Sequence, residues 1–336
     1  MSTADAPPVI EARDLKTHFT VGGGIFSALA GVPPRIVRAL DGVDIAIRER
    51  EIVGLVGESG CGKSTLGMTL VRMHEPTGGE IRHGGRAITG IGGAELKSYR
   101  ARAQIIFQDP YSSLNPRLTV ERIVAEPLEI HQIGTKEARR EKVARALAHV
   151  RMPFAEYADR HPSDLSGGQR QRVAIARALV LEPAFVVADE PVSMLDVSIQ
   201  AGVLELLDEL SRKLGLAVLY ISHDIATVGY ICDRVAVMYL GRIVEQGPVQ
   251  RVLRNPIHPY TQRLMAAIPN ADPAFKRARV ELEGDVPTPL AVPKGCRFAA
   301  RCPHAEAVCR EIEPDLEMHA AGQSVRCHFA SRFVKS

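Results

Sequence analysis

Short apolar runs alternate with stretches of helical periodicity along most of the chain. The apolar runs have the length of buried strands and predict strands over 51–56, 104–107, 185–190, 217–222 and 234–247. Apolar residues that recur every three or four positions predict helices over 66–73, 135–152 and 197–214. This alternation predicts an α/β fold whose largely parallel sheet is covered by helices on both faces.

Two of the predicted helices have a definite buried face. In the helix over 135–152, Thr135 is the expected N-cap, and the side chains expected to face inward are Val143, Leu147 and Val150. In the helix over 197–214, the side chains expected to face inward are Leu204, Leu207 and Leu210.

The composition changes near Asn255, where proline and cysteine become frequent. A chain of 336 residues is longer than one core usually supports, so a large domain with an appendage is expected. We place the boundary within 247–255, which gives a first domain over 1–250 and a C-terminal extension over 251–336. The glycine-rich segment 22–34 predicts a loop between two early strands.

Charge and hydropathy exclude several classes of protein. The formal net charge is only +3, so no strong field for nucleic acid is expected. No apolar run approaches the ~18 residues that a membrane span needs, and the N-terminus lacks the pattern of a signal peptide. We therefore expect a cytosolic protein, whose six cysteines are thiols or metal ligands rather than disulfides.

One glycine-rich stretch has the spacing of a phosphate-binding loop. Residues 57–64 match G-x-x-x-x-G-K-[ST] between a predicted strand and a predicted helix. In such a loop the backbone N–H groups hold phosphates, Lys63 reaches the β- and γ-phosphates, and Ser64 binds Mg²⁺. The expected nucleotide-binding residues here are Gly57, Ser59, Gly60, Cys61, Gly62, Lys63, Ser64 and Thr65.

Polar residues follow three other predicted strands. Asp189 ends the strand over 185–190 and is the expected acid for Mg²⁺, while Glu190 is the general-base candidate. Gln108 and His223 each follow a further strand, and the ends of parallel strands meet at one edge of a sheet. Gln108 is therefore expected to contact Mg²⁺ or the attacking water, and His223 the γ-phosphate.

A second helix N-terminus with exposed backbone N–H groups lies at 165–169, LSGGQ. Ser166 can cap the helix that follows, and two glycines leave the N–H groups accessible to an anion. Because the first loop already binds phosphate, this second site is either spare or serves a nucleotide bound to another molecule.

With these motifs the chain resembles the ATP-binding-cassette (ABC) ATPases over roughly residues 9–250. GESGCGKST resembles their Walker A motif, LSGGQ their signature, and FVVADE their Walker B motif with its catalytic glutamate. The matches to their Q-loop, D-loop and H-switch are Gln108, Asp196 and His223. The resemblance implies a P-loop ATPase with a RecA-like core, an antiparallel β subdomain, and a helical subdomain over about 108–165.

The same resemblance implies two cassettes paired head to tail, with ATP and Mg²⁺ held between them. Catalytic roles would then belong to Lys63, Gln108, Glu190 and His223. Mg²⁺ would be held by Ser64, Gln108 and Asp189. The partner's nucleotide would be contacted in trans by Ser166, Gly168, Gln169 and Asp196. Phe19 is the expected stacking partner of the adenine ring, with His18 as the rival.

Three further stretches resemble the ATP-binding subunits of bacterial dipeptide and oligopeptide importers, in particular the second ATPase subunit of the dipeptide type. These stretches are IIFQDPYSSLNPRLTV, NPIHPYTQRLMAAIP and the cysteine-rich tail. The resemblance implies an ATPase that powers peptide import from the cytoplasmic face of the membrane. Its implied partners are a paralogous ATPase subunit, two transmembrane permease subunits that would contact 111–120, and indirectly a solute-binding protein. Met194 departs from the alanine that is common before the D-loop.

Two other functions stay open on the sequence. One is a soluble ABC ATPase that acts on nucleic acid or the ribosome, which the small net charge and the single signature disfavour. The other is an importer of a non-peptide solute such as a metal.

The small C-terminal extension carries four cysteines, Cys296, Cys302, Cys309 and Cys327, in the pattern C-x₅-C-x₆-C-x₁₇-C. This is not a common zinc spacing, but four thiolates suit a [4Fe–4S] cluster or zinc. The family resemblance implies the iron–sulfur cluster, while zinc and free or disulfide-bonded thiols remain alternatives. Cys232, which lies apart from them, is expected in the core.

Overall fold

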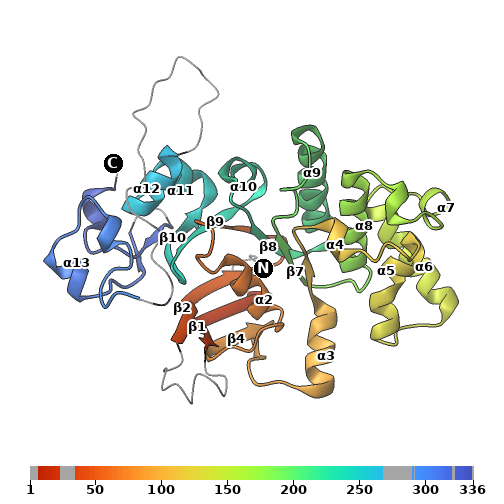
Figure 1. Cartoon of the computed structure of the whole chain (residues 1–336), viewed down its shortest axis with the longest axis horizontal. Helices are drawn as coiled ribbons and strands as arrows, with labels where there is room; N and C mark the ends of the chain where they lie inside the picture. The colour runs from red at the N-terminus through yellow and green to blue at the C-terminus, as the bar shows by residue number, and fades with distance from the viewer. Residues whose placement is uncertain (1–6, 23–34, 268–289, 291, 320–321, 335–336) are drawn as a thin grey trace.

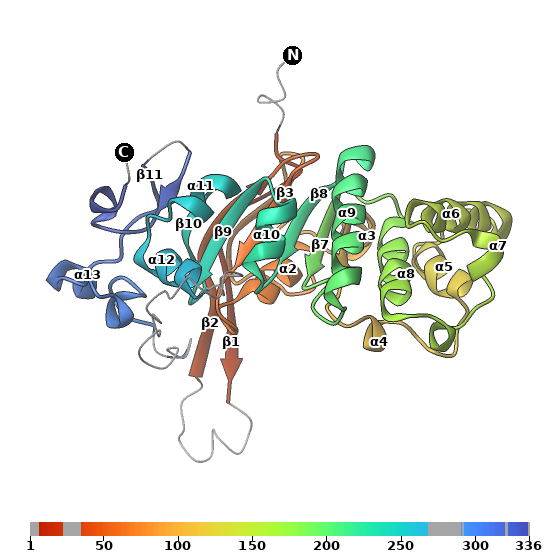
Figure 2. The same cartoon turned by 90° about the horizontal axis from the view of Figure 1, so that it is seen from above.

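The computed structural model describes residues 7–22, 35–267, 290, 292–319 and 322–334. In these ranges an eight-stranded sheet crosses the molecule, and a four-stranded sheet shares a core with one of its faces (Figures 1 and 2). The loop predicted over 22–34 lies outside the described residues, except for Gly22.

Five neighbouring strands of the large sheet are parallel. In spatial order they are β9 (Arg234–Tyr239), β3 (Ile52–Val56), β8 (Ala217–Ile221), β7 (Phe185–Asp189) and β6 (Ala103–Ile106). Beyond β9 the sheet continues antiparallel through β10 (Arg242–Pro248), β12 (Ser324–Val325) and β11 (Glu317–Met318). The predicted strands are confirmed to within two residues, except that 234–247 forms the two strands β9 and β10.

The central strands are apolar on both faces because each face has a core of its own. Along β7, Phe185 and Val187 pack into one core, while Val186 and Ala188 pack into the other. The first core also contains α2 (Lys63–Leu70) and the small sheet, and the second contains α8 (Gly167–Leu179) and α9 (Val197–Leu214). Successive side chains of a strand point to opposite faces of the sheet. Because both faces are covered here, no position of the strand faces water and needs a polar residue. The predicted α/β architecture is confirmed for the five parallel strands, while β10, β12 and β11 make the whole sheet mixed.

The small sheet is antiparallel, as expected for the β subdomain. Its strands, in spatial order, are β2 (Arg35–Ile47), β1 (Ile10–Val21), β4 (Gly78–His83) and β5 (Arg86–Ala87). Helix α3 (Gly93–Arg102) connects this sheet to β6.

Helices gather at the β6 end of the large sheet (Figure 2). They are α4 (Pro110–Ser113), α5 (Val120–Ile130), α6 (Lys136–His149), α7 (Phe154–Tyr157), the 3₁₀ turn η1 (Pro162–Asp164) and α8. Thr135 caps α6 by accepting a hydrogen bond from the backbone N of Ala138. The predicted inward faces of α6 and α9 are confirmed, since all six side chains named for them are buried.

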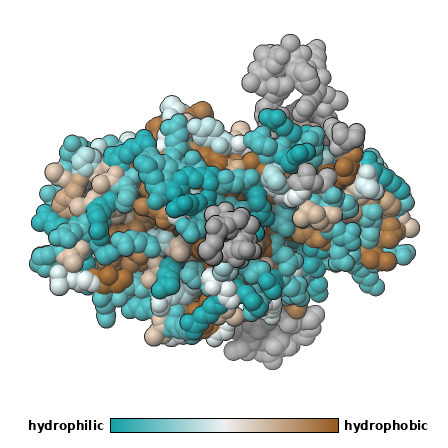
Figure 3. Space-filling model, turned by 180° about the vertical axis from the view of Figure 1, so that it is seen from behind, coloured by the Kyte–Doolittle hydropathy of each residue, from teal (hydrophilic) through white to brown (hydrophobic). Residues whose placement is uncertain are grey.

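No helix in the described ranges is long and apolar enough to cross a membrane. The 18 residues of α9 include charged side chains such as Glu205 and Arg212. Seen from behind, the surface is mostly hydrophilic, with hydrophobic residues in small separate groups (Figure 3).

The C-terminal extension is closely joined to the rest of the chain. Its elements are α11 (Val249–Arg254), α12 (Pro259–Ala266), η2 (Ala299–Arg301), α13 (Ala307–Glu311), β11, β12 and η3 (Ala330–Arg332). Strand β12 pairs with β10 and so extends the large sheet, with Val325 opposite Glu245. Phe298 belongs to one of the two main cores, against which Cys296 and Cys302 also pack. The extension is therefore joined to the cassette through both backbone pairing and side-chain packing.

Glu245 connects β10 to two parts of this C-terminal region. Its carboxylate is fully buried and accepts hydrogen bonds from the backbone N–H groups of Ile257 and His258, each at 2.9 Å. The Gln323 side chain donates a third hydrogen bond at 3.2 Å. Burial raises the pKa of Glu245, and these hydrogen bonds oppose the rise.

We predict that Glu245→Gln lowers the free energy of unfolding by about 1–3 kcal/mol, because the new NH₂ group faces a backbone N–H and leaves it unsatisfied. Chemical denaturation followed by circular dichroism measures the change. Glu317→Gln, at an exposed position of β11, is the matched control and should be nearly neutral. Equal stabilities of the two variants would contradict the role given to Glu245.

Candidate functional site

The candidate site lies where β3, β8, β7 and β6 end. These strands are parallel neighbours, so the residues that follow them meet at one edge of the sheet. The P-loop follows β3, Asp189 ends β7, and Gln108 and His223 come shortly after β6 and β8. The convergence predicted from the sequence is therefore present.

Residues 57–62 turn tightly between β3 and α2. Gly62 caps α2 with a φ of 110°, in the left-handed region that favours glycine. A Cβ atom there would also clash with the backbone oxygen of Ala39 in β2. Gly57 and Gly60 likewise have positive φ. These glycines let the loop leave its N–H groups and the start of α2 available for phosphate.

The lysine of the loop lies at its centre and is buried. The Lys63 ammonium donates to the backbone oxygen of Gly57 at 2.7 Å and of Glu58 at 3.0 Å. The Ser64 hydroxyl lies close enough to Asp189 to lower the pKa of that carboxyl. Burial raises the pKa of Asp189, the hydrogen bond from Ser64 and the charge of Lys63 lower it, and the nearby Glu190 raises it further. Ser64 and Asp189 thus form the adjacent hydroxyl and carboxylate oxygens that suit Mg²⁺.

The side chains of Gln108, Glu190 and His223 form one connected group. Gln108 donates its amide N–H to one oxygen of Glu190 at 2.7 Å, and Nδ1 of His223 lies 3.1 Å from the other oxygen. Glu190 has a φ of 46°, a left-handed backbone that costs a non-glycine residue roughly 1–2 kcal/mol. Its backbone N–H donates to Ile221 at the end of β8 at 2.9 Å, which holds the strained residue in place.

The other P-loop residues differ in exposure. Ser59, Gly60 and Ser64 are exposed, and Thr65 is partly buried. Cys61 is buried, and burial raises the pKa of its thiol, so this cysteine has little thiolate with which to react.

The signature residues form the start of α8. The hydroxyl of Ser166 accepts from the backbone N of Gln169 at 3.3 Å, and the Gln169 side chain accepts from the backbone N of Ser166 at 2.9 Å. A Cβ at Gly168 would come within 2.5 Å of Ile199 in α9, so only glycine fits without a shift. In both views α8 lies with the helices at the β6 end, away from α2 (Figures 1 and 2). The structure therefore does not bring the signature to the P-loop of the same chain.

Two aromatic candidates for the adenine ring lie side by side in β1. Phe19 is partly exposed and meets the ring of His74 edge-on at 5.2 Å. His18 lies 2.9 Å from the Asp41 carboxylate through Nε2, so its ring already has a partner.

All six cysteines lie in the described ranges and are free thiols. Cys232 is buried in the core, as expected. The four tail cysteines line one small cavity together with His258 and Phe298. No group of three or more His, Cys, Asp or Glu side chains within the described part of the chain is arranged to hold a metal ion. The thiols thus share a cavity without forming a ligand set.

His258, which also lines that cavity, has a neutral buried ring. Its Nδ1 accepts from the backbone N of Tyr260 at 3.0 Å, so its hydrogen lies on Nε2. Burial lowers the pKa of His258 to about 3, which keeps the ring neutral. The buried Nε2 has no hydrogen-bond partner among the described residues.

Sequence reasoning missed the contacts of the second P-loop residue. Glu58 is contacted by Tyr260 and Arg301 of the C-terminal region, 202 and 243 positions further along the chain. The motif that contains Tyr260, NPIHPY, was visible in the sequence, but nothing in it pointed to the P-loop.

Comparisons with known proteins show the family of the chain. Residues 40–193 match the family described as ABC transporter, and residues 244–309 match the oligopeptide/dipeptide transporter C-terminal region. The oligopeptide transport ATP-binding protein AppF of Bacillus subtilis (strain 168) is 44% identical over 334 residues, which cover 98% of this chain and 100% of AppF. The dipeptide transport ATP-binding protein DppF of Escherichia coli (strain K12) is 46% identical over 330 residues, which cover 97% of each chain. The chain belongs to the ATP-binding subunits of dipeptide and oligopeptide ABC transporters.

Solved ABC cassettes share the fold of this transporter subunit. The dimeric post-hydrolysis structure of the cassette MJ0796 bound to ADP and Pi is 28% identical, with a TM-score of 0.61, and covers 71% of this chain and 98% of its own. The cassette cbiO1 from Clostridium perfringens is 27% identical, with a TM-score of 0.63, and covers 74% of this chain and 91% of its own.

Proposed function

We propose that this subunit hydrolyses ATP to power the import of dipeptides or oligopeptides across the cytoplasmic membrane. ATP hydrolysis is supported by the group that Gln108, Glu190 and His223 form beside the P-loop. The match of residues 244–309 to the oligopeptide/dipeptide transporter family favours a peptide over another solute such as a metal. It also favours transport over an action on nucleic acid or the ribosome.

In this proposal each residue of the site has one task. Lys63 and the backbone N–H groups of the loop bind the β- and γ-phosphates, while Ser64, Asp189 and Gln108 would hold Mg²⁺, which neutralises developing charge when bound. Glu190 accepts a proton from the attacking water, and Gln108 orients the Glu190 carboxylate. His223, 3.1 Å from Glu190, donates to the γ-phosphate.

The position of the signature supports a pair of cassettes. Ser166, Gly168 and Gln169 lie at a helix N-terminus away from their own P-loop, so the nucleotide that they contact is bound by a partner. Asp196 is exposed between the exposed side chains of Met194 and Val197, which indicates a surface available to that partner. The dimeric structure of the MJ0796 cassette has a similar fold. We propose a paralogous ATPase subunit as the partner.

The proposal extends to the rest of the transporter. The cassette over 1–250 would dock on two permease subunits at the cytoplasmic face of the membrane, and a solute-binding protein would deliver the peptide. The helical subdomain over about 108–165 is the proposed contact. Its Tyr111 side chain is exposed and lies over the Arg170 guanidinium at 4.3 Å, directly beside the signature. Phe19 is the proposed partner of the adenine ring.

For the extension over 251–336 we propose that Cys296, Cys302, Cys309 and Cys327 hold a [4Fe–4S] cluster. The support is that these four thiols line one cavity together with His258, whose buried Nε2 has no hydrogen-bond partner among the described residues. Within the described ranges no three of these side chains are arranged to hold a single metal ion, so the proposal rests on the shared cavity.

We predict that Glu190→Gln keeps ATP binding and slows turnover by about 10²–10⁴-fold, the usual contribution of a general base. Steady-state ATPase activity and equilibrium binding of ATP, measured on the assembled transporter, separate the two effects. Glu205→Gln in α9 is the matched control because Glu205 is exposed. Near-normal turnover in Glu190→Gln would remove Glu190 from its role.

We predict that Ser166→Arg abolishes hydrolysis at the composite site to which this signature belongs, while ATP still binds to the P-loop of the mutated chain. The arginine fills the space beside the helix N-terminus that the partner's nucleotide would occupy. The test is ATPase activity and photo-crosslinking of labelled ATP to each subunit of the complex. Unchanged hydrolysis would count against the arrangement in trans.

We predict that anaerobically purified protein contains about four iron atoms and four acid-labile sulfides per chain. Cys309→Ser should lose most of both, whereas Cys232→Ser should keep them, because Cys232 lies apart in the core. One zinc per chain would favour the zinc alternative, and a metal-free protein would leave the cysteines as thiols.

A further inference from the structure

The second residue of the P-loop is held from both ends by the C-terminal region. The backbone N–H of Glu58 donates to the hydroxyl of Tyr260 at 3.0 Å. The Glu58 carboxylate pairs with the Arg301 guanidinium at 2.9 Å, and the exposed fractions of the two side chains are only 15% and 5%. Water therefore screens this ion pair little.

Three packed aromatic rings fix the positions of Tyr260 and Arg301. The ring of Tyr239, at the end of β9, lies 4.7 Å from the ring of Tyr260 and 5.4 Å from that of Phe298. The Tyr239 hydroxyl accepts a hydrogen bond from Arg301 at 3.3 Å. All three rings are fully buried, so Tyr260 and Arg301 have little freedom to move away from Glu58.

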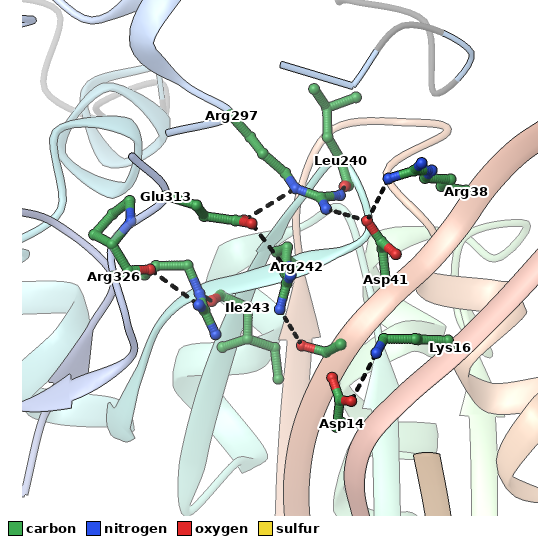
Figure 4. A network of polar contacts seen from close by, with 12 residues as sticks. Asp14, Lys16, Arg38, Asp41, Leu240, Arg242, Ile243, Arg297, Glu313 and Arg326 are labelled. Carbon is green, nitrogen blue, oxygen red and sulfur yellow. Dashed lines mark hydrogen bonds and ion pairs between the residues drawn. The ribbon is translucent and has the colours of Figure 1, made fainter. Parts of the chain in front are cut away.

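The segment that carries Arg301 is fixed to the small sheet as well. Arg297, four residues earlier, pairs with Asp41 of β2 at 2.5 Å and with Glu313 at 3.2 Å, and it donates to the backbone oxygen of Leu240 (Figure 4). Asp41 in turn contacts His18 of β1 at 2.9 Å. Residues 296–302 thus contact both the P-loop and β2, the strand that pairs with the strand of His18 and Phe19.

The negative charge of Glu58 explains why its ion pair with Arg301 affects nucleotide binding. One oxygen of the Glu58 carboxylate is buried without a hydrogen-bond partner in the described ranges. The ion pair with Arg301 therefore provides most of what offsets the cost of burying this charge. A carboxylate left unpaired within a phosphate-binding loop would repel the triphosphate at short range and in a poorly screened environment. The unpaired Glu58 side chain would also be free to move, and the backbone of the P-loop would move with it.

We propose that Arg301 and Tyr260 are positioning residues of the P-loop: they neutralise and fix Glu58, so the C-terminal region sets the affinity of the cassette for ATP. The proposal rests on the proposed function only in that the loop binds ATP. Neither side chain belongs to the group around Glu190, so the chemical step itself should be affected little.

The test removes the charge of Arg301, and then that of Glu58 as well, in the assembled transporter. Arg301→Gln leaves Glu58 unpaired and should raise the KM for ATP and the dissociation constant of a fluorescent ATP analogue at least about fivefold, with kcat changed less than about twofold. Glu58→Gln in the same chain removes the unpaired charge and should return both values to within about twofold of wild type. Arg332→Gln is the matched control, because Arg332 pairs with Glu306 inside the extension.

Tyr260→Phe is a second variant that keeps the ring and removes the acceptor for the Glu58 N–H. It should raise the same dissociation constant without lowering kcat, even where Arg301→Gln fails to fold. An unchanged dissociation constant in both Arg301→Gln and Tyr260→Phe would overturn the proposal. A loss of affinity that Glu58→Gln does not restore would overturn the charge argument. If the wild-type complex itself bound no ATP, the proposed function would fail instead.

Discussion

The whole nucleotide site depends on one constraint, the parallel pairing of four buried strands. Because β3, β8, β7 and β6 run in the same direction, the residues after them meet at one edge. That pairing is stable only with helices on both faces, which is why each strand contributes side chains to two separate cores. Glu190 can hold its strained backbone because the strand before it and the neighbouring β8 cannot shift.

Local patterns predict the strands of this part of the molecule and the polar residues at their ends. The apolar runs end within one residue of the strands, and Gln108, Asp189 and His223 lie at or shortly after the strand ends that share an edge. Their contacts follow from the order of the strands, which links residues up to 82 positions apart in the case of Gln108 and Glu190. The sequence predicts that these residues meet at one edge of a sheet, but spacing alone does not determine which strands are neighbours.

The C-terminal region was harder to predict for a physical reason. Proline and cysteine mark a segment of unusual composition, but composition does not show what the segment packs against. The ion pair between Glu58 and Arg301 and the ladder between β10 and β12 each join residues far apart in the chain, and neither leaves a periodic signal. Buried charged residues such as Glu245, Arg297 and Arg301 resemble surface residues in the sequence, and only their partners explain their burial.

The P-loop is therefore constrained from two directions. Its own C-terminal region holds Glu58 and, through Arg297 and Asp41, the strand that carries the adenine candidates. The signature lies elsewhere in the same chain, so we propose that a partner contacts the other side of the nucleotide. A loop whose backbone is fixed before the partner arrives loses less conformational freedom when the two cassettes close on ATP. On this view the contacts of Glu58 with the C-terminal region make closure of the two cassettes more favourable, while Gln108, Glu190 and His223 are the residues proposed to act in hydrolysis.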